Sequence, residues 1–132
     1  MAGLNVDADA VVVRLSLLER LGAFALSEPT TPVAAVEAVR VSEDPWSELR
    51  GIRAPGTGWP GVIALGTRRY SGRRDFVAVY GRKRKAAVVE FNSGRYGRFV
   101  VTHDQAEQLG QELLRTRRGR TRRHRSIRRH VP

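Results

Sequence analysis

The chain has 132 residues, of which 41% are hydrophobic, no cysteine, and a formal net charge of +11. This length allows one compact domain with a single core, and the missing cysteine excludes disulfides, thiolate catalysis and cysteine-ligated metals. No apolar stretch approaches the roughly 20 residues of a membrane-spanning helix, and acidic residues precede the first apolar run, unlike in a secretion signal. We therefore expect a soluble, cytoplasmic protein.

The charge is distributed unevenly along the chain. Residues 1–49 carry three basic and eight acidic side chains, residues 50–99 carry twelve and two, and residues 115–132 carry nine arginines and no acid. Residues 1–10 are small and acidic without periodicity, so we expect them to be disordered. The sequence thus predicts a folded domain over residues 11–114, followed by a disordered basic segment over 115–132.

The first part of the domain predicts short strands and helical turns. Alternating apolar residues predict a strand over 11–17. A helical turn follows over 18–24, where Gly22 ends it, and residues 23–28 form a plausible short strand. Pro29 and Pro32 predict a loop over 29–32, because prolines remove ladder donors.

Residues 33–49 predict one more strand and one more turn. The alanines of 33–41 favour helix, but alternation and short length favour a strand. Asp44 and Pro45 are an N-cap and a first helical residue, so they predict a capped helical turn over 45–49 that Trp46 anchors.

A glycine-rich loop and a hairpin form the centre of the predicted domain. Glycines and prolines between residues 51 and 61 predict a loop with Trp59 packed beneath it. The apolar runs 62–65 and 76–80 predict two strands joined by a turn at Ser71 and Gly72. Because nearly every position in both runs is apolar, these strands need cover on both faces.

The remaining residues predict two strands and a helix. Residues 81–85 (GRKRK) form an exposed turn, 86–91 a buried strand, 92–94 a turn and 98–102 the last strand. Asp104 and Glu107 form a capping pair, and an apolar stripe follows at helical spacing. The stripe comprises Ala106, Leu109, Leu113 and Leu114.

This order of elements predicts a mainly β fold with one C-terminal α-helix. We expect about seven antiparallel strands, connected as a meander, in a partly open barrel or sandwich that the helix caps. The series resembles the bacterial pleckstrin-homology-like (PH-like) domains of actinobacterial type. Three stretches, which cover more than half of the chain, carry the resemblance: VAAVEAVRVSEDPWSELRGIRAPGTGWPGVIALGTRRY, DFVAVYGRKRKAAVVEF and RFVVTHDQAEQLGQELLR.

The resemblance implies two near-orthogonal sheets with a helix at one opening. It also implies binding of lipids, peptides or proteins rather than catalysis. Lipid-binding members of the superfamily place basic residues in the loop after the first strand. The corresponding residues 17–26 hold only Arg20 here, so the resemblance does not imply phosphoinositide binding.

The sequence patterns that resemble catalytic or cofactor-binding motifs lack the neighbouring residues or elements that those functions require. Gly56, Gly58 and Gly61 match the G-x-G-x-x-G pattern of dinucleotide-binding loops, but a strand follows where that fold requires a helix. Residues 61–67 partly match the pattern of a phosphate-binding loop, but the lysine that this pattern requires is missing. His103 has no second histidine with which to share a metal. We expect no enzyme activity, cofactor or metal, and a ligand carrier or enzyme that uses the 56–61 loop is a minor alternative.

Basic residues are the remaining functional signal. Two clusters flank the predicted strand 76–80, and in a meander their turns lie at opposite ends of the sheet, so they need not form one patch. The excess of positive charge there predicts an anion-binding surface. The candidate residues are Arg68, Arg69, Arg73, Arg74, Arg82, Lys83, Arg84 and Lys85.

The basic segment carries the strongest signal. Its candidate residues are Arg117, Arg118, Arg120, Arg122, Arg123, Arg125, Arg128 and Arg129. Arginines at this density bind phosphates with release of counterions, and they are attracted to anionic bilayers. Aromatic residues for base stacking are missing, so the segment predicts no sequence-specific reading. We expect a binding module attached to an anionic partner, either a membrane surface or an acidic protein, with a nucleic-acid-binding accessory protein as the alternative.

Overall fold

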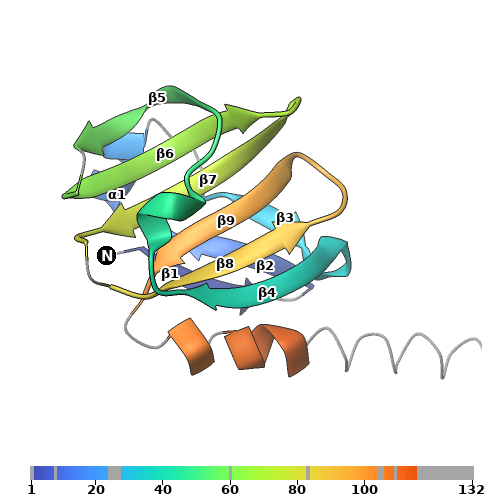
Figure 1. The fold of residues 1–132 in the computed structure, drawn as a ribbon. Coiled ribbons are helices and arrows are strands. Elements are labelled where there is room, and N and C mark those ends of the chain that lie inside the picture. Colours follow the sequence, from blue (N-terminus) through green and yellow to red (C-terminus); the bar gives the residue numbers. More distant parts are fainter. Residues whose placement is uncertain are drawn as a thin grey trace, which may run out of the picture.

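The computed structural model describes residues 2–7, 9–23, 28–59, 61–82, 84–103, 106–108 and 110–115, which form two open sheets (Figure 1). The smaller sheet has the order β1 (Gly3–Asp7), β2 (Ala10–Arg14) and β3 (Thr30–Pro32). The larger sheet has the order β4 (Val36–Ser42), β8 (Ala86–Phe91), β9 (Tyr96–Thr102), β7 (Arg73–Tyr80), β6 (Ile63–Tyr70) and β5 (Ile52–Trp59). The prediction of a mainly β fold is confirmed, but the sheets are open and form no closed barrel.

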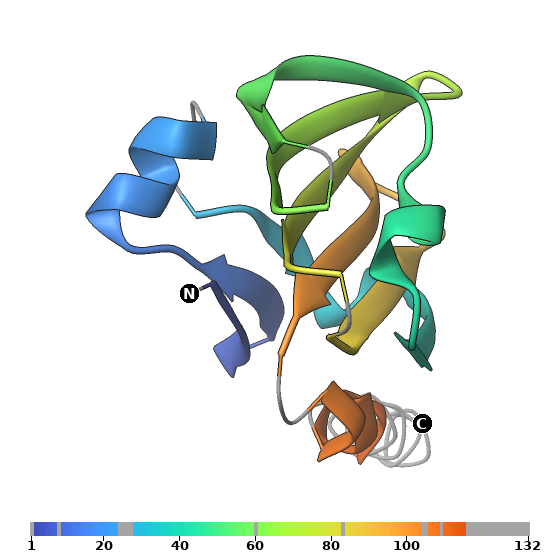
Figure 2. The same cartoon turned by 60° about the vertical axis from the view of Figure 1, so that its left-hand side comes forward.

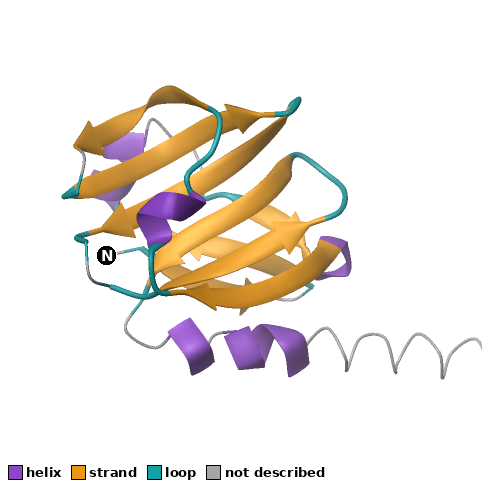
Figure 3. Ribbon diagram, viewed as in Figure 1, coloured by secondary structure: helices purple, strands orange, loops and turns teal. Residues whose placement is uncertain are grey.

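Helical elements are short and lie outside the sheets (Figure 3). They are α1 (Leu17–Ala23), the 3-10 turns η1 (Val33–Ala35) and η2 (Pro45–Glu48), and a C-terminal helix at residues 106–108 and 110–115. The predicted turns at 18–24 and 45–49 are thereby confirmed. Asp44 is the N-cap residue of η2 and Pro45 its first residue, as predicted, but the Asp44 side chain makes no capping hydrogen bond.

The strands do not form an antiparallel meander. β9 lies between β8 and β7, antiparallel to β8 but parallel to β7, with Phe76 opposite Phe99. β7 and β8, which are consecutive in the chain, are therefore not neighbours in the sheet, and the later strand β9 lies between them. The prediction of antiparallel neighbours throughout is wrong at this pair because the sequence shows each strand but not its partner.

Two apolar clusters cover the two faces of the central strands. Phe76 and Ala78 of β7 lie in the main core between the sheets, whereas Val77 and Val79 face the other way, toward Trp46 and Leu49. This alternation follows from the two-residue period of a strand, and it confirms the expected cover on both faces. The C-terminal helix contributes its buried Ala106 and Leu113 to the main core.

The first strand contradicts the predicted N-terminal disorder. β1 pairs with β2 over five residues, and Leu4 is buried in the main core with Val6 packed against it. Ala2, Leu4 and Val6 alternate with polar or small residues, a pattern typical of a strand. The pattern is short, and the prediction of disorder followed the acidic composition instead. The predicted strand 11–17 ends earlier, because α1 begins at Leu17.

Prolines and glycines proved compatible with edge strands. β3 includes Pro32 although a loop was predicted over 29–32, and it pairs only with β2. β5 replaces most of the predicted loop 51–61 and pairs only with β6, with a register shift between Arg53 and Gly56. An edge strand tolerates missing donors and bulges because one of its sides has no ladder to maintain.

The predicted reversal at Ser71 and Gly72 is confirmed. Tyr70 pairs with Arg73 across a two-residue loop, and the φ angles of 52° at Ser71 and 78° at Gly72 define a type I′ turn. The strands on both sides are longer than predicted, so the four flanking arginines belong to the ladder.

Several predictions fall on residues outside those described. These are the strand at 24–27, the cap at Asp104, the stripe position Leu109, the candidate Lys83 and the basic segment from residue 116 onward. Arg115, predicted to be disordered, is helical.

Candidate anion-binding surface

The two predicted basic clusters lie at opposite ends of β7. Arg68 and Arg69 end β6, and Arg73 and Arg74 begin β7, so all four surround the turn at Ser71. Arg82, Arg84 and Lys85 follow the other end of β7 (Figure 1). The structure therefore brings four candidates together at one end and three at the other, and they do not form one face.

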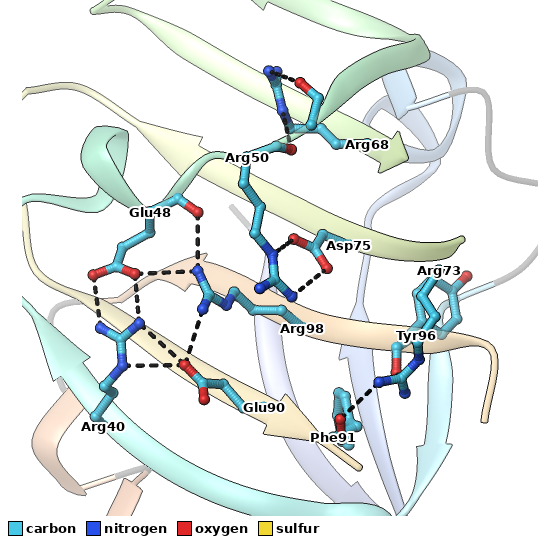
Figure 4. A network of polar contacts seen from close by, with 11 residues as sticks. Arg40, Glu48, Arg50, Arg68, Arg73, Asp75, Glu90, Phe91, Tyr96 and Arg98 are labelled. Carbon is cyan, nitrogen blue, oxygen red and sulfur yellow. Dashed lines mark hydrogen bonds and ion pairs between the residues drawn. The ribbon is translucent and has the colours of Figure 1, made fainter. Parts of the chain in front are cut away.

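Arg68 and Arg73 are used inside the fold. Arg68 donates to the carbonyl oxygens of Arg50 and Gly51, both at 3.1 Å. Arg73 donates to the carbonyl oxygen of Phe91 at 3.0 Å and to that of Tyr96 at 2.5 Å (Figure 4). Each guanidinium thus satisfies two carbonyl groups of a neighbouring segment with its forked donors. We assign both residues to structure rather than to ligand binding.

Of the four candidates around the turn at Ser71, Arg69 and Arg74 remain available to bind an anionic ligand. They are direct cross-strand partners of β6 and β7, and neither has a side-chain hydrogen bond or ion pair with another described residue. Like charges placed opposite each other on a sheet repel. An anion between them would remove this repulsion.

The cluster after β7 is partly neutralised. The Lys85 ammonium lies 2.9 Å from Glu107 of the C-terminal helix, and this pairing raises the pKa of Lys85. Arg82 is exposed and lies against Gly61, where a Cβ atom would collide with its guanidinium. Gly61 has a φ of 77°, so it allows both the turn and this close approach.

A network of carboxylates and arginines on the outer face of the large sheet was missed from the sequence (Figure 4). Arg40 forms a bidentate pair with Glu48 at 2.6 and 2.5 Å. Arg98 lies 3.3 Å from Glu48 and 3.0 Å from Glu90. Separately, Arg50 contacts Asp75 at 2.6 Å and stacks on Tyr70, 4.4 Å from the ring centre.

The strand register explains this network. Arg68, Asp75, Arg98 and Glu90 are successive cross-strand neighbours on β6, β7, β9 and β8. Opposite charges therefore alternate along one row of the sheet, which is a stabilising arrangement. The sequence does show charged residues inside apolar strands. Which of them are neighbours follows only from the pairing of β7 with β9.

The charges of this network compensate each other. Hydrogen bonds from Arg40 hold the pKa of Glu48 below its ordinary value, and the hydrogen bond to Asp75 raises the pKa of Arg50. The charged side chains of the network therefore already have partners within the fold. Among the described residues, no cluster of three histidine, cysteine, aspartate or glutamate side chains could hold a metal ion.

Glu19 forms a second internal contact, between α1 and the large sheet. Its backbone N–H binds the Ser16 hydroxyl at 3.2 Å, its carboxylate accepts from the Ser16 N–H at 3.0 Å, and the Tyr80 hydroxyl donates to its other oxygen. Burial acts to raise the pKa of Glu19, but these hydrogen bonds outweigh it and lower the pKa. Burial and the Glu19 contact raise the pKa of Tyr80.

The glycine motif serves strand pairing. Gly56 lies in β5 opposite Gly66 of β6, and a Cβ atom on Gly56 would lie 2.6 Å from the Leu65 carbonyl oxygen. A shallow hollow lies beside this pair, and its lining includes Ala64, Val77 and Arg68. The motif thus lacks the helix N-terminus that a dinucleotide loop requires, and Trp59 is exposed instead of packed beneath a loop.

Comparisons with protein-family models, with curated proteins and with solved structures find no match to this chain. Among the described residues, no helix has the length and apolar character to cross a membrane.

Proposed function

We propose that this chain is a non-enzymatic binding module of PH-like fold that attaches to an anionic partner, a membrane surface or an acidic protein, through its arginine-rich segment 115–132. On this proposal it works in the cytoplasm, at the surface of that partner. The two sheets and the packed C-terminal helix support the PH-like assignment. One observation carries the function: the folded part uses much of its basic charge internally, whereas the nine arginines of 115–132 have no acid among them.

This division of charge has a physical consequence. Arg40, Arg50 and Arg98 are bound to carboxylates, so they add little to the field outside the protein. The arginines of the segment release counterions when they bind phosphates or other anions. Attachment should therefore depend on the segment and weaken steeply with salt.

Deletion of residues 115–132 tests the proposal. Retention of the full chain and the deletion variant on anionic vesicles and on RNA is measured across a salt series, with thermal unfolding measured in parallel. We expect most retention to be lost and the melting temperature to stay almost unchanged. Undiminished retention would overturn the proposal.

Two full-length variants separate charge from chain length. Replacing the eight arginines from Arg117 to Arg129 by lysine keeps the charge, so we expect retention to persist. Replacing them by glutamine keeps the length but removes the charge, so retention should fall as in the deletion. Equal loss in both variants would mean that the guanidinium group, not the charge, is recognised.

A nucleic-acid-binding accessory protein is the second candidate. The pair of exposed Arg69 and half-buried Arg74 favours it, because the pair would add a second contact to a phosphate backbone. Gel-shift with RNA and DNA, compared with vesicle flotation at the same salt concentrations, separates the two candidates. An Arg69→Gln/Arg74→Gln variant that weakens only the gel-shift would favour nucleic acid.

A further inference from the structure

Exposed apolar side chains gather at one end of the molecule. Leu17, Leu18 and Leu21 of α1 are 74, 80 and 66% exposed, and Trp59 and Val62 at the β5–β6 turn are 69 and 58% exposed. Among the residues whose burial is described, the one other exposed large apolar side chain is Tyr70, which is 44% exposed beside the turn at Ser71. Large apolar groups gathered on a surface indicate an interaction site.

Contacts between α1 and the β5–β6 hairpin join the five residues into one surface, the apolar end. The Thr57 hydroxyl of β5 donates to the Gly22 carbonyl of α1 at 2.6 Å, and Trp59 follows Thr57 on the same face of β5. The Gly81 N–H donates to the Val62 carbonyl at 2.8 Å. Both views place α1 beside this end of β5 and β6 (Figures 1 and 2).

The leucines point away from the protein. α1 directs its buried residues Glu19 and Ala23 inward, so positions 17, 18 and 21 lie on the outer side of the helix. In Figure 2, α1 stands out from the rest of the fold. The apolar end is thus a projection and not a groove.

Positive charge borders the apolar end. Arg82 follows Gly81, is exposed and lies against Gly61 of the β5–β6 turn, and Lys85 lies three residues further on. Glu19 of α1 accepts from Tyr80, Glu28 is paired with Arg14 and Arg20, and Glu107 is paired with Lys85. The combination of projecting leucines, a tryptophan and basic residues is typical of side chains at the boundary of an anionic bilayer.

We propose that the apolar end inserts into an anionic lipid bilayer, with Leu17, Leu18, Leu21 and Trp59 at the level of the lipid headgroups and Arg82 beside their phosphates. This proposal rests on the proposed function for the electrostatic attraction that segment 115–132 supplies, since two signals give firmer attachment than one. A second copy fits less well, because two positively charged ends would repel each other.

A triple substitution tests the insertion. The full chain and its Leu17→Gln/Leu18→Gln/Leu21→Gln variant are compared in flotation with phosphatidylcholine vesicles that contain phosphatidylglycerol. We expect the variant to bind about tenfold more weakly, with the difference persisting at high salt, because buried apolar area is not screened. Tyr70→Gln is the matched control, and it should bind like the natural chain. Thermal unfolding checks that both variants fold.

Tryptophan fluorescence gives an independent reading. Trp59 is exposed, whereas Trp46 is half-buried and donates to the Gly81 carbonyl at 2.7 Å. Added vesicles should shift the emission of the natural chain to the blue and leave Trp59→Phe unshifted. An unshifted natural chain, or a leucine variant that binds as tightly as the natural chain, would overturn the insertion.

These outcomes are distinct from failure of the proposed function. If deletion of 115–132 abolishes binding and the leucine variant binds normally, segment 115–132 is the sole anchor and the insertion is wrong. If the deletion changes nothing, the proposed function is wrong, and the leucine variant still decides the insertion. If the natural chain dimerises through these leucines in solution, the apolar end binds a second copy of the chain, and the proposed insertion into a bilayer is wrong.

Discussion

Neighbouring arginines in this protein differ in what they do. Arg73 donates to two carbonyl oxygens, whereas Arg74 beside it has no described side-chain partner. The same holds for Arg68 and Arg69. Because alternate strand residues point to opposite faces, one arginine of each pair faces the outer polar network and the other does not. The sequence predicted all four as ligand residues since it shows the charge but not the face.

Substitution of Arg73 and Arg74 by lysine tests this difference. Lysine has one compact ammonium group and cannot reproduce the forked contacts of Arg73. Arg73→Lys should therefore lower the free energy of unfolding by about 1 kcal/mol, and Arg74→Lys should leave it within about 0.5 kcal/mol. Urea unfolding measures both, and equal losses would contradict the structural role of Arg73.

Glu48 governs part of the pH dependence of stability. It accepts hydrogen bonds from Arg40 and Arg98, the latter with a side chain only 13% exposed. Glu48→Gln should lower the free energy of unfolding by about 2 kcal/mol at pH 7, because Arg98 loses a partially buried partner.

The sign of the pH effect follows from the direction of the shift. The pKa of Glu48 is lowered from 4.5 in the folded chain, so its contribution is present above pH 4.5 and is lost as the pH falls through the folded value. Glu28 and Glu19 shift in the same direction. Melting temperatures measured from pH 7 to pH 3 should fall less steeply for Glu48→Gln than for the natural chain. Glu43→Gln, at an exposed position, is the control, and parallel curves for all three proteins would refute the pairing.

At the scale of elements, the sequence predicted correctly those turns and strands that depend on interactions within a few residues. The turn at Ser71 and Gly72, the turn anchored by Trp46 and the strand 86–91 were predicted from such patterns and are confirmed. β1, β3 and β5 were missed because their composition is acidic, proline-containing or glycine-rich, and pairing with a neighbour overrides these weak preferences.

The turn itself permits a quantitative test. Ser71 holds a φ of 52°, a conformation that asparagine adopts more readily and that a β-branched residue resists. Ser71→Asn should raise the free energy of unfolding by about 0.5 kcal/mol, and Ser71→Val should lower it by about 1 kcal/mol or more. Thermal unfolding gives the order of the three proteins, and a more stable valine variant would exclude the type I′ turn.

At the scale of the whole molecule, the sequence predicted the class of the fold but not its topology. The parallel pairing of β7 with β9 joins residues far apart in the chain, and no local pattern specifies it. The alternation of charges along the row of Arg68, Asp75, Arg98 and Glu90 depends on that pairing. The apolar end was missed as well, because helical spacing predicts the turn but not the direction in which α1 faces Leu17, Leu18 and Leu21, which are exposed.

The central claim is that charge for attachment lies in segment 115–132 and not in the folded part. The most direct measurement is the slope of log affinity against log salt concentration for a single-stranded oligonucleotide, which serves as a test polyanion. The natural chain should give a slope of about −6, as expected for eight arginines that release counterions from a single strand. The variant with glutamine at those eight positions should give a slope near zero. An equally steep slope for the glutamine variant would place the anion-binding charge in the folded domain and contradict the account.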